Sequence, residues 1–146
     1  MSDTRYLAFD YGTRRIGVAV GERATRTAHG IVTVASGRAG ADWKHIAALI
    51  DEWRPDTLVI GLPLAMDGHE TTMSRDSRRF GAELGRRHAL PVEWMDERLS
   101  SDDAQHRLRA ATAPGRRISR RRTRRLDQLA AQLILETYLE QQRGPP

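Results

Sequence analysis

The sequence contains no cysteine, which excludes a disulfide scaffold, a thiolate metal site and a cysteine nucleophile. Its five histidines show no short metal-ligand spacing such as H-x-x-x-H. No apolar run approaches the roughly 18 residues that a transmembrane helix needs, and the N-terminus carries no apolar signal region. We therefore expect a cytoplasmic protein that has no membrane partner.

Lysine is also scarce, because Lys44 is the only lysine among 24 basic residues. The arginines are unevenly placed: seven of them, and no acid, lie between Arg116 and Arg125. The whole chain has a net charge of +5, so the remainder without these seven arginines carries −2. Such a block of like charge is a usual footprint of a surface that binds nucleic-acid phosphates, and a solvated loop is the alternative.

A chain of 146 residues, 39% hydrophobic and 29% charged, is long enough for one folded domain with a full core. Short β-branched or apolar runs predict five strands, at 5–10, 15–20, 31–35, 57–62 and 91–95. Apolar residues at helical spacing and capping residues predict four helices, over 42–53, 72–84, 100–109 and 123–141.

The order of these elements predicts an α/β fold. The first three strands follow one another too closely for helical crossovers, so they form an antiparallel meander, whereas the later strands have helices between them and can be parallel. The result is a mixed five-stranded sheet with helices on both faces. We expect a single domain over 1–141, with a flexible arginine-rich loop over 111–122 and a frayed tail over 142–146.

Three carboxylates stand at positions where chemistry is possible. Asp10 ends the first strand, and Glu97 follows the fifth strand, so both are expected at an edge of the sheet. Asp127 shares a helix face with small apolar residues that would pack on the sheet. Together these acids could hold hard divalent cations, which prefer oxygen ligands, and two such ions can activate a water and stabilise the leaving oxygen of a phosphodiester.

Each of these acids also has an ordinary structural interpretation. Asp10 could cap a D-x-G turn, and one acid of the Asp96–Glu97 pair could cap the helix that follows. Asp127 could lie at the rim of its helix face and pair with an arginine at 121, 122, 124 or 125. Asp67, before Gly68, is best interpreted as a turn residue.

Four sequence blocks resemble the YqgF/RuvX family in order and spacing, and they cover the chain nearly end to end. The blocks are F-D-Y-G-T-R-R-I-G-V-A-V at 9–20, V-I-G-L-P-L-A-M-D-G at 59–68, L-P-V-x-x-x-D-E-R-L-S at 90–100 and D-x-x-A-A-x-L-I-L-E-x-Y-L at 127–139. The resemblance implies a ribonuclease H-like fold, akin to that of bacterial Holliday junction resolvases. It also implies a nuclease that acts in the 5′-end maturation of pre-16S ribosomal RNA.

By motif position, the resemblance implies that Asp10, Glu97 and Asp127 are the catalytic, metal-binding acids, with Mg²⁺ or Mn²⁺ as the cofactor and two ions expected. Arg15 and Arg98 are candidates for contacting phosphates or for holding the carboxylates in place. The remaining expected nucleic-acid contacts are the seven arginines of the basic block, namely Arg116, Arg117, Arg120, Arg121, Arg122, Arg124 and Arg125.

Other functions stay open at this point. The chain could be a Holliday junction resolvase that acts on branched DNA, or a non-catalytic RNA-binding or transcription factor. D-x-G-T before a hairpin also resembles the first phosphate loop of actin-like kinases, but those proteins need two such domains. The expected partner is nucleic acid, either pre-16S rRNA or branched DNA. The chain could be a monomer or a homodimer, and a resolvase that cuts two symmetric strands would need two active sites.

Overall fold

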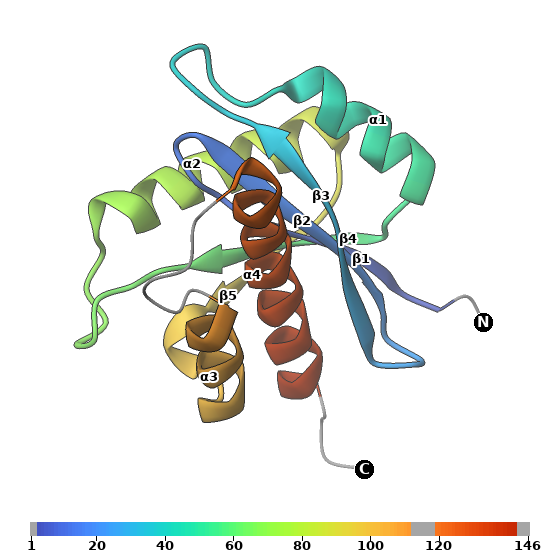
Figure 1. Cartoon of the computed structure of the whole chain (residues 1–146). Coiled ribbons are helices and arrows are strands. Elements are labelled where there is room, and N and C mark those ends of the chain that lie inside the picture. The colour runs from blue at the N-terminus through green and yellow to red at the C-terminus, as the bar shows by residue number, and fades with distance from the viewer. Residues whose placement is uncertain (1–2, 112–118, 143–146) are drawn as a thin grey trace.

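The computed structural model describes residues 3–111 and 119–142, which form one five-stranded sheet with helices packed on both of its faces (Figure 1). The strands are β1 (Arg5–Asp10), β2 (Arg15–Glu22), β3 (Thr27–Ala35), β4 (Thr57–Leu62) and β5 (Val92–Asp96). The helices are α1 (Trp43–Trp53), α2 (Thr72–His88), α3 (Asp102–Ala111) and α4 (Arg120–Gln141), and a 3₁₀ turn, η1 (Glu97–Leu99), follows β5.

The strand order in the sheet is β3-β2-β1-β4-β5. β1 pairs antiparallel with β2 and parallel with β4, β2 pairs antiparallel with β3, and β4 pairs parallel with β5. The predicted meander and the predicted parallel strands are therefore confirmed. Because β1, β4 and β5 run parallel, the C-terminal ends of these three strands lie at the same edge of the sheet.

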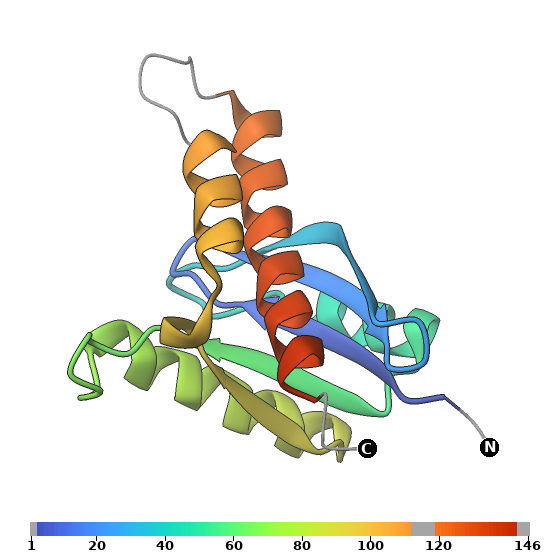
Figure 2. The same ribbon diagram turned by 90° about the horizontal axis from the view of Figure 1, so that it is seen from below.

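Side chains alternate between the two faces of each strand, and the two faces are covered differently. One face buries a cluster of large apolar side chains against α1 and α2. The other face buries a second cluster, rich in alanine on the strands, against α4 (Figure 1). α3 packs beside α4, and Figure 2 shows these two helices side by side.

Several element boundaries differ from the prediction. β3 begins at Thr27, not at residue 31, because the ladder with β2 continues to the Glu22–Thr27 pair and pairing overrides the weak strand propensity of this segment. α4 begins at Arg120, three residues before the predicted start, because the side chain of Ser119 accepts the backbone N–H of Arg122 at 3.1 Å and caps the helix.

The loop predicted over 111–122 is correspondingly shorter. Ala111 is the last residue of α3, and residues 120–122 form the first turn of α4. The predicted flexibility falls mainly on residues 112–118, which lie outside the described part of the chain, as do 143–146 of the predicted tail. Among the helices of the described residues, none combines the length and the apolar character needed to cross a membrane.

Candidate active site

Asp10 ends β1 on the face that α4 covers. In the strand register it lies opposite Gly17 of β2. Ala8, two residues earlier and therefore on the same face, is fully buried in the cluster under α4. The hairpin from β1 to β2 thus sets the Asp10 carboxylate at the sheet edge, beneath the N-terminal half of α4.

Glu97 reaches the same face from the end of β5. A Cβ placed on Gly61, in the neighbouring strand β4, would lie 3.0 Å from Oε2 of Glu97. The preceding acid, Asp96, serves another purpose: its side chain accepts the backbone N–H of Arg98 at 2.9 Å and starts the 3₁₀ turn. Asp96 therefore caps the 3₁₀ turn, and Glu97 enters the site. This agrees with the interpretation that one acid of the Asp96–Glu97 pair has a capping role.

Asp127 comes from α4, and its backbone lies against β2. A Cβ placed on Gly17 would lie only 1.9 Å from the backbone oxygen of Asp127, so glycine is the residue that allows this approach. The carboxylate Oδ2 of Asp127 accepts a hydrogen bond from Nε of Arg15 at 2.8 Å. The predicted partners at 121, 122, 124 and 125 are wrong: the arginine that pairs with Asp127 comes from the start of β2.

The carboxyl groups of Asp10 and Glu97 both have raised pKa values. Burial, and then the nearby charges of Glu97 and Asp127, raise the pKa of Asp10 to about 7. Burial, and then the charge of Asp96, raise the pKa of Glu97 to about 7. Within the described residues, neither carboxylate forms an ion pair with an arginine or lysine. These two half-buried carboxylates are oxygen donors that fit a hard divalent cation, which would compensate their charge.

The three acids do not form a ready-made metal site. Among the described residues, no group of three acidic, histidine or cysteine side chains is arranged so that it could hold a metal ion. One carboxylate oxygen of Asp127 is already paired with Arg15. Asp10 and Glu97, which have no such ion pair among the described residues, keep their oxygens available for a cation.

Arg98 lies close to the site but holds a different acid. Its Nε lies 3.0 Å from both carboxylate oxygens of Asp96, and its Nη2 lies 2.6 Å from Oδ2. These hydrogen bonds hold the pKa of Asp96 below its usual value. Nη1 of Arg98 also donates to the carbonyl of Met66 at 3.4 Å, which ties the loop after β4 to the end of β5. The phosphate contact expected of Arg98 stays a prediction.

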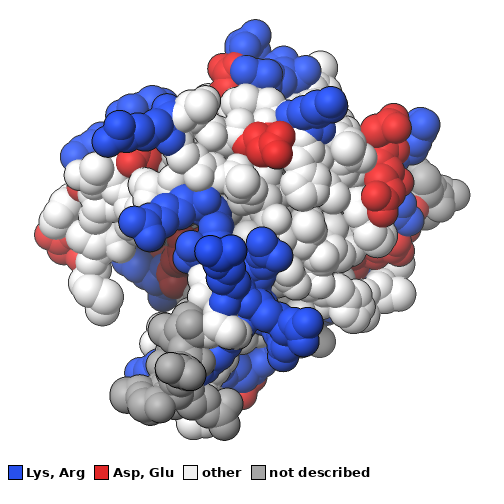
Figure 3. Space-filling model, turned by 45° about the horizontal axis from the view of Figure 1, so that its top comes forward, with Lys and Arg blue, Asp and Glu red and all other residues white. Residues whose placement is uncertain are grey.

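The described part of the basic block forms the N-terminal end of α4, where Figure 3 shows arginine side chains gathered into a patch. A cavity of about 370 Å³ opens there, lined by Arg15, Ser119, Arg120, Thr123 and Arg124. Within the described residues, none of the block's arginines forms an ion pair with a carboxylate. Arg116 and Arg117 lie outside the described residues.

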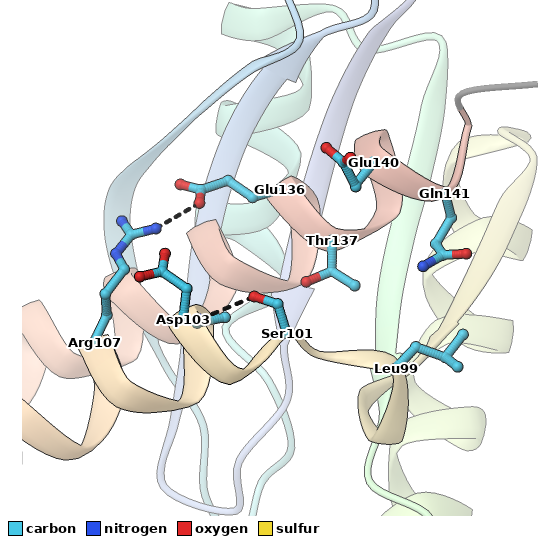
Figure 4. A pocket seen from close by; sticks show the side chains of 9 residues that line it. Leu99, Ser101, Asp103, Arg107, Glu136, Thr137, Glu140 and Gln141 are labelled. Carbon is cyan, nitrogen blue, oxygen red and sulfur yellow. Dashed lines mark hydrogen bonds and ion pairs between the residues drawn. The ribbon is translucent and has the colours of Figure 1, made fainter.

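A second cavity of about 310 Å³ lies between α3 and the C-terminal half of α4 (Figure 4). Nη1 of Arg107 pairs with Oε1 of Glu136 at 2.7 Å across its wall, and Thr137 at its base is buried. Asp103 and Glu140 also line it, so acids outnumber the single arginine, which distinguishes this cavity from the arginine-lined one. It contributes to the contact between two helices and holds none of the predicted site residues.

A family model described as RuvX, Holliday junction resolvase, matches residues 4–141. The chain belongs to the RuvX family. Two RuvX-like relatives carry the name "Putative pre-16S rRNA nuclease". The protein from Nitrosococcus oceani is 45% identical over 137 residues, which cover 93% of this chain and 86% of that protein. The protein from Burkholderia cenocepacia is 45% identical over 139 residues, which cover 95% and 91%.

The RuvX chain also resembles solved structures of RuvC from Thermus thermophilus. RuvC in complex with a Holliday junction substrate superposes with a TM-score of 0.56 at 13% identity, covering 98% of this chain and 99% of RuvC. A second RuvC structure gives a TM-score of 0.50 at 10% identity, over 94% of this chain and 96% of RuvC. At such low identity the likeness concerns the fold, and it confirms the predicted ribonuclease H-like fold of this RuvX chain.

The sequence predicted the contacts of α4 with the sheet only in part. Arg15 was a candidate for holding a carboxylate, and it does so, but no local pattern could reveal Asp127, 112 positions away, as its partner. The close contact between α4 and the sheet did leave a signal, since Gly17, Ala19 and Gly21 are small residues at every second position of β2 and therefore share one face.

Proposed function

We propose that this RuvX-family chain is a metal-dependent nuclease that hydrolyses phosphodiester bonds of structured nucleic acid, acting in the cytoplasm on the 5′ end of pre-16S rRNA. The observation that carries the proposal is the half-buried pair Asp10 and Glu97, which reach one face at the ends of β1 and β5 and whose pKa values desolvation and neighbouring charge raise to about 7. Acids with this shift, beside a surface rich in arginine, suit chemistry on a phosphate ester. The names of the relatives support the choice of RNA substrate.

In this mechanism Asp10 and Glu97 would hold the metal, Mg²⁺ or Mn²⁺, and Asp127 would complete the acidic set from α4. When bound, one or two such ions would activate a water and stabilise the charge on the leaving oxygen. The protein supplies the rest: α4 covers the face on which the two carboxylates lie, Arg15 fixes Asp127, and the arginines at the start of α4 attract the phosphate backbone.

The test compares cleavage of 5′-extended pre-16S RNA and of a four-way DNA junction at saturating Mg²⁺ or Mn²⁺. Asp10→Asn and Glu97→Gln keep the size of each side chain and remove one negative charge. We expect each to lower the cleavage rate about 100-fold or more, while nucleic-acid binding stays equal or tightens because acidic repulsion falls. Asp67→Asn is the matched control, since Asp67 is an exposed turn residue at the same end of the sheet and bonds only locally to His69.

The outcomes separate the candidate functions. Cleavage of the RNA, lost in both site variants and kept in Asp67→Asn, supports the proposal. Cleavage of the junction alone favours a resolvase, which would also require a dimer in solution. Binding without cleavage by the wild-type protein favours an RNA-binding or transcription factor. Cleavage that survives Asp10→Asn contradicts the assignment of the site.

A further inference from the structure

Arg15 occupies a position between the acids and the arginine patch. It is the first residue of β2 and extends toward α4, where its Nε donates to Oδ2 of Asp127 at 2.8 Å. The same side chain lines the cavity of about 370 Å³ at the start of α4. One guanidinium group therefore contacts the acidic site with one edge and borders the basic surface with the rest.

Most of the hydrogen-bonding capacity of Arg15 is unused by the described residues. A guanidinium has five N–H donors in a planar fork. Only Nε has a hydrogen-bond partner within the described residues, so the four N–H groups on Nη1 and Nη2 are available toward the cavity. A fork of this kind matches the two oxygens of a phosphate, which it can bind in bidentate fashion.

The cavity has the chemistry of a phosphate site. Three of its five lining residues are arginines, from β2 and α4, and the other two, Ser119 and Thr123, carry hydroxyl groups. The first turn of α4 contains no acid, although the helix dipole favours negative charge there. Arg120 and Arg124 form no ion pair with a described carboxylate, and the pair of Arg15 with Asp127 uses only Nε, so positive charge is left over that can bind an anion.

The pair with Asp127 has little structural value by itself. The Arg15 side chain is 39% exposed and that of Asp127 is 19% exposed, and partly exposed ion pairs contribute little to stability. Stability alone therefore gives a weak reason for placing an arginine against an acid of the site.

We propose that Arg15 couples substrate binding to the acidic site: Nε holds the Asp127 carboxylate, while the Nη groups bind a backbone phosphate of the nucleic acid in the cavity lined by Arg120 and Arg124. The inference rests on the proposed function and adds to it one defined phosphate subsite and a positioning role for Arg15. A substrate phosphate in this cavity fixes the guanidinium, and the guanidinium in turn fixes Asp127.

The phosphate contact of Arg15 is tested by binding in EDTA, where no cleavage occurs. The probes are pre-16S leader oligonucleotides, each with one backbone phosphate replaced by a neutral methylphosphonate at a successive position. In the wild-type protein, one position should weaken binding about tenfold, as expected for a lost hydrogen bond to a charged group. In Arg15→Gln the same replacement should change binding less than about twofold, because the contact is already absent. Arg38→Gln, an exposed arginine between β3 and α1, should reproduce the wild-type profile.

The role of Arg15 in positioning Asp127 is tested with Arg15→Lys. An ammonium group is a single point charge and cannot hold a carboxylate and a phosphate as a fork does. We expect the Kd of Arg15→Lys for substrate to lie within about threefold of the wild-type value. Its kcat should be about tenfold or more below that of wild type. Thermal melting of both variants checks that they are folded before either assay is interpreted.

An unchanged methylphosphonate profile in Arg15→Gln overturns the phosphate contact. A wild-type kcat in Arg15→Lys, at saturating substrate, overturns the coupling to Asp127. If the wild-type protein cleaves neither substrate, the proposed function fails, and the methylphosphonate series still decides whether Arg15 binds a phosphate.

Discussion

On the face of the sheet covered by α1 and α2, the strands present large apolar side chains such as Leu7, Phe9 and Ile16, all fully buried. On the opposite face, alternate positions of the same strands carry Ala8 and Gly17, and α4 lies directly on them. The small residues let the α4 backbone approach the strands closely, as the contact between Gly17 and the backbone of Asp127 shows.

This difference explains where the acids can stand. On the face with large side chains, apolar surface is buried and supplies the hydrophobic free energy of folding. On the face with small side chains, less apolar surface is buried at the sheet edge, and the space is shared by Asp10, Glu97 and Asp127. We therefore expect substitutions on the first face to change mainly stability, and substitutions on the second to change mainly function.

The largest change in the free energy of unfolding should come from Leu84→Ala, in α2. Leu84 is fully buried in the cluster under α1 and α2, and truncation leaves a cavity that costs about 2–5 kcal/mol. Urea unfolding measures this loss. At a temperature where the variant is still folded, nucleic-acid binding and cleavage should equal those of wild type. A folded Leu84→Ala protein without activity would show that the two faces are not independent.

The second effect is a pH dependence of stability that originates on the α4 face. Because the pKa of Asp10 and that of Glu97 are raised to about 7, the folded protein keeps protons that the unfolded chain releases above about pH 4. Stability of the metal-free protein therefore falls as pH rises through this window, by roughly 2–3 kcal/mol per carboxyl between pH 5 and 7.

Asp10→Asn removes the part of this pH-dependent loss of stability that is due to the Asp10 carboxyl. The free energies of unfolding of the two proteins can be measured with urea in EDTA at pH 5 and pH 8. The stability of the variant relative to wild type should be higher at pH 8 than at pH 5. Mg²⁺ at pH 8 should then stabilise wild type more than the variant, because an ion that binds only the folded state raises its stability. Equal pH profiles would contradict the buried environment of Asp10.

A smaller loss of stability, with a complete loss of cleavage, is expected for Gly17→Ala. The new methyl group would lie 1.9 Å from the backbone oxygen of Asp127, so α4 must shift, at a cost of about 1–3 kcal/mol. The shift moves Asp127 relative to Asp10. Gly37→Ala is the matched control, since a Cβ there has no described atom within 4 Å and the change should cost within about 0.5 kcal/mol. Full activity of Gly17→Ala would contradict the need for close contact.

The smallest effect on stability belongs to the double variant Arg120→Gln/Arg121→Gln. Both side chains are exposed at the start of α4, so the free energy of unfolding should change by less than about 0.5 kcal/mol. Binding should weaken without sequence dependence, and each lost phosphate contact should lower the salt slope by about 0.7–0.9. Titrations at several salt concentrations measure this slope. The exposed pair Arg38→Gln/Lys44→Gln, near α1, should bind as wild type does.

Local patterns were sufficient to predict most of the fold. The strands over 5–10 and 57–62 are confirmed with the predicted bounds, and Asp42 caps α1 as predicted, accepting the backbone N–H of His45 at 3.2 Å. These features depend on neighbouring residues, on periodicity and on hydrogen bonds within one turn. The mixed topology followed from the lengths of the connections alone.

Long-range contacts limited the prediction of the candidate site. The strand ends brought Asp10 and Glu97 to one edge, as their positions in the sequence indicated. One interpretation of Asp127 paired it with arginines close to it in the sequence, because local spacing shows which residues of one helix are neighbours. Its actual partner depends on the approach of α4 to β2, which is set by packing between distant segments.

The position of α4 at the end of the chain determines when the acidic site can be assembled during synthesis. The ribosome makes β1 and β5, with Asp10 and Glu97, before it makes α4, which supplies Asp127 and covers that face. Domains generally complete folding as units, after their last element has emerged. A nascent chain therefore carries two of the three acids without the third, and the site is assembled only when α4 has emerged and the whole domain folds.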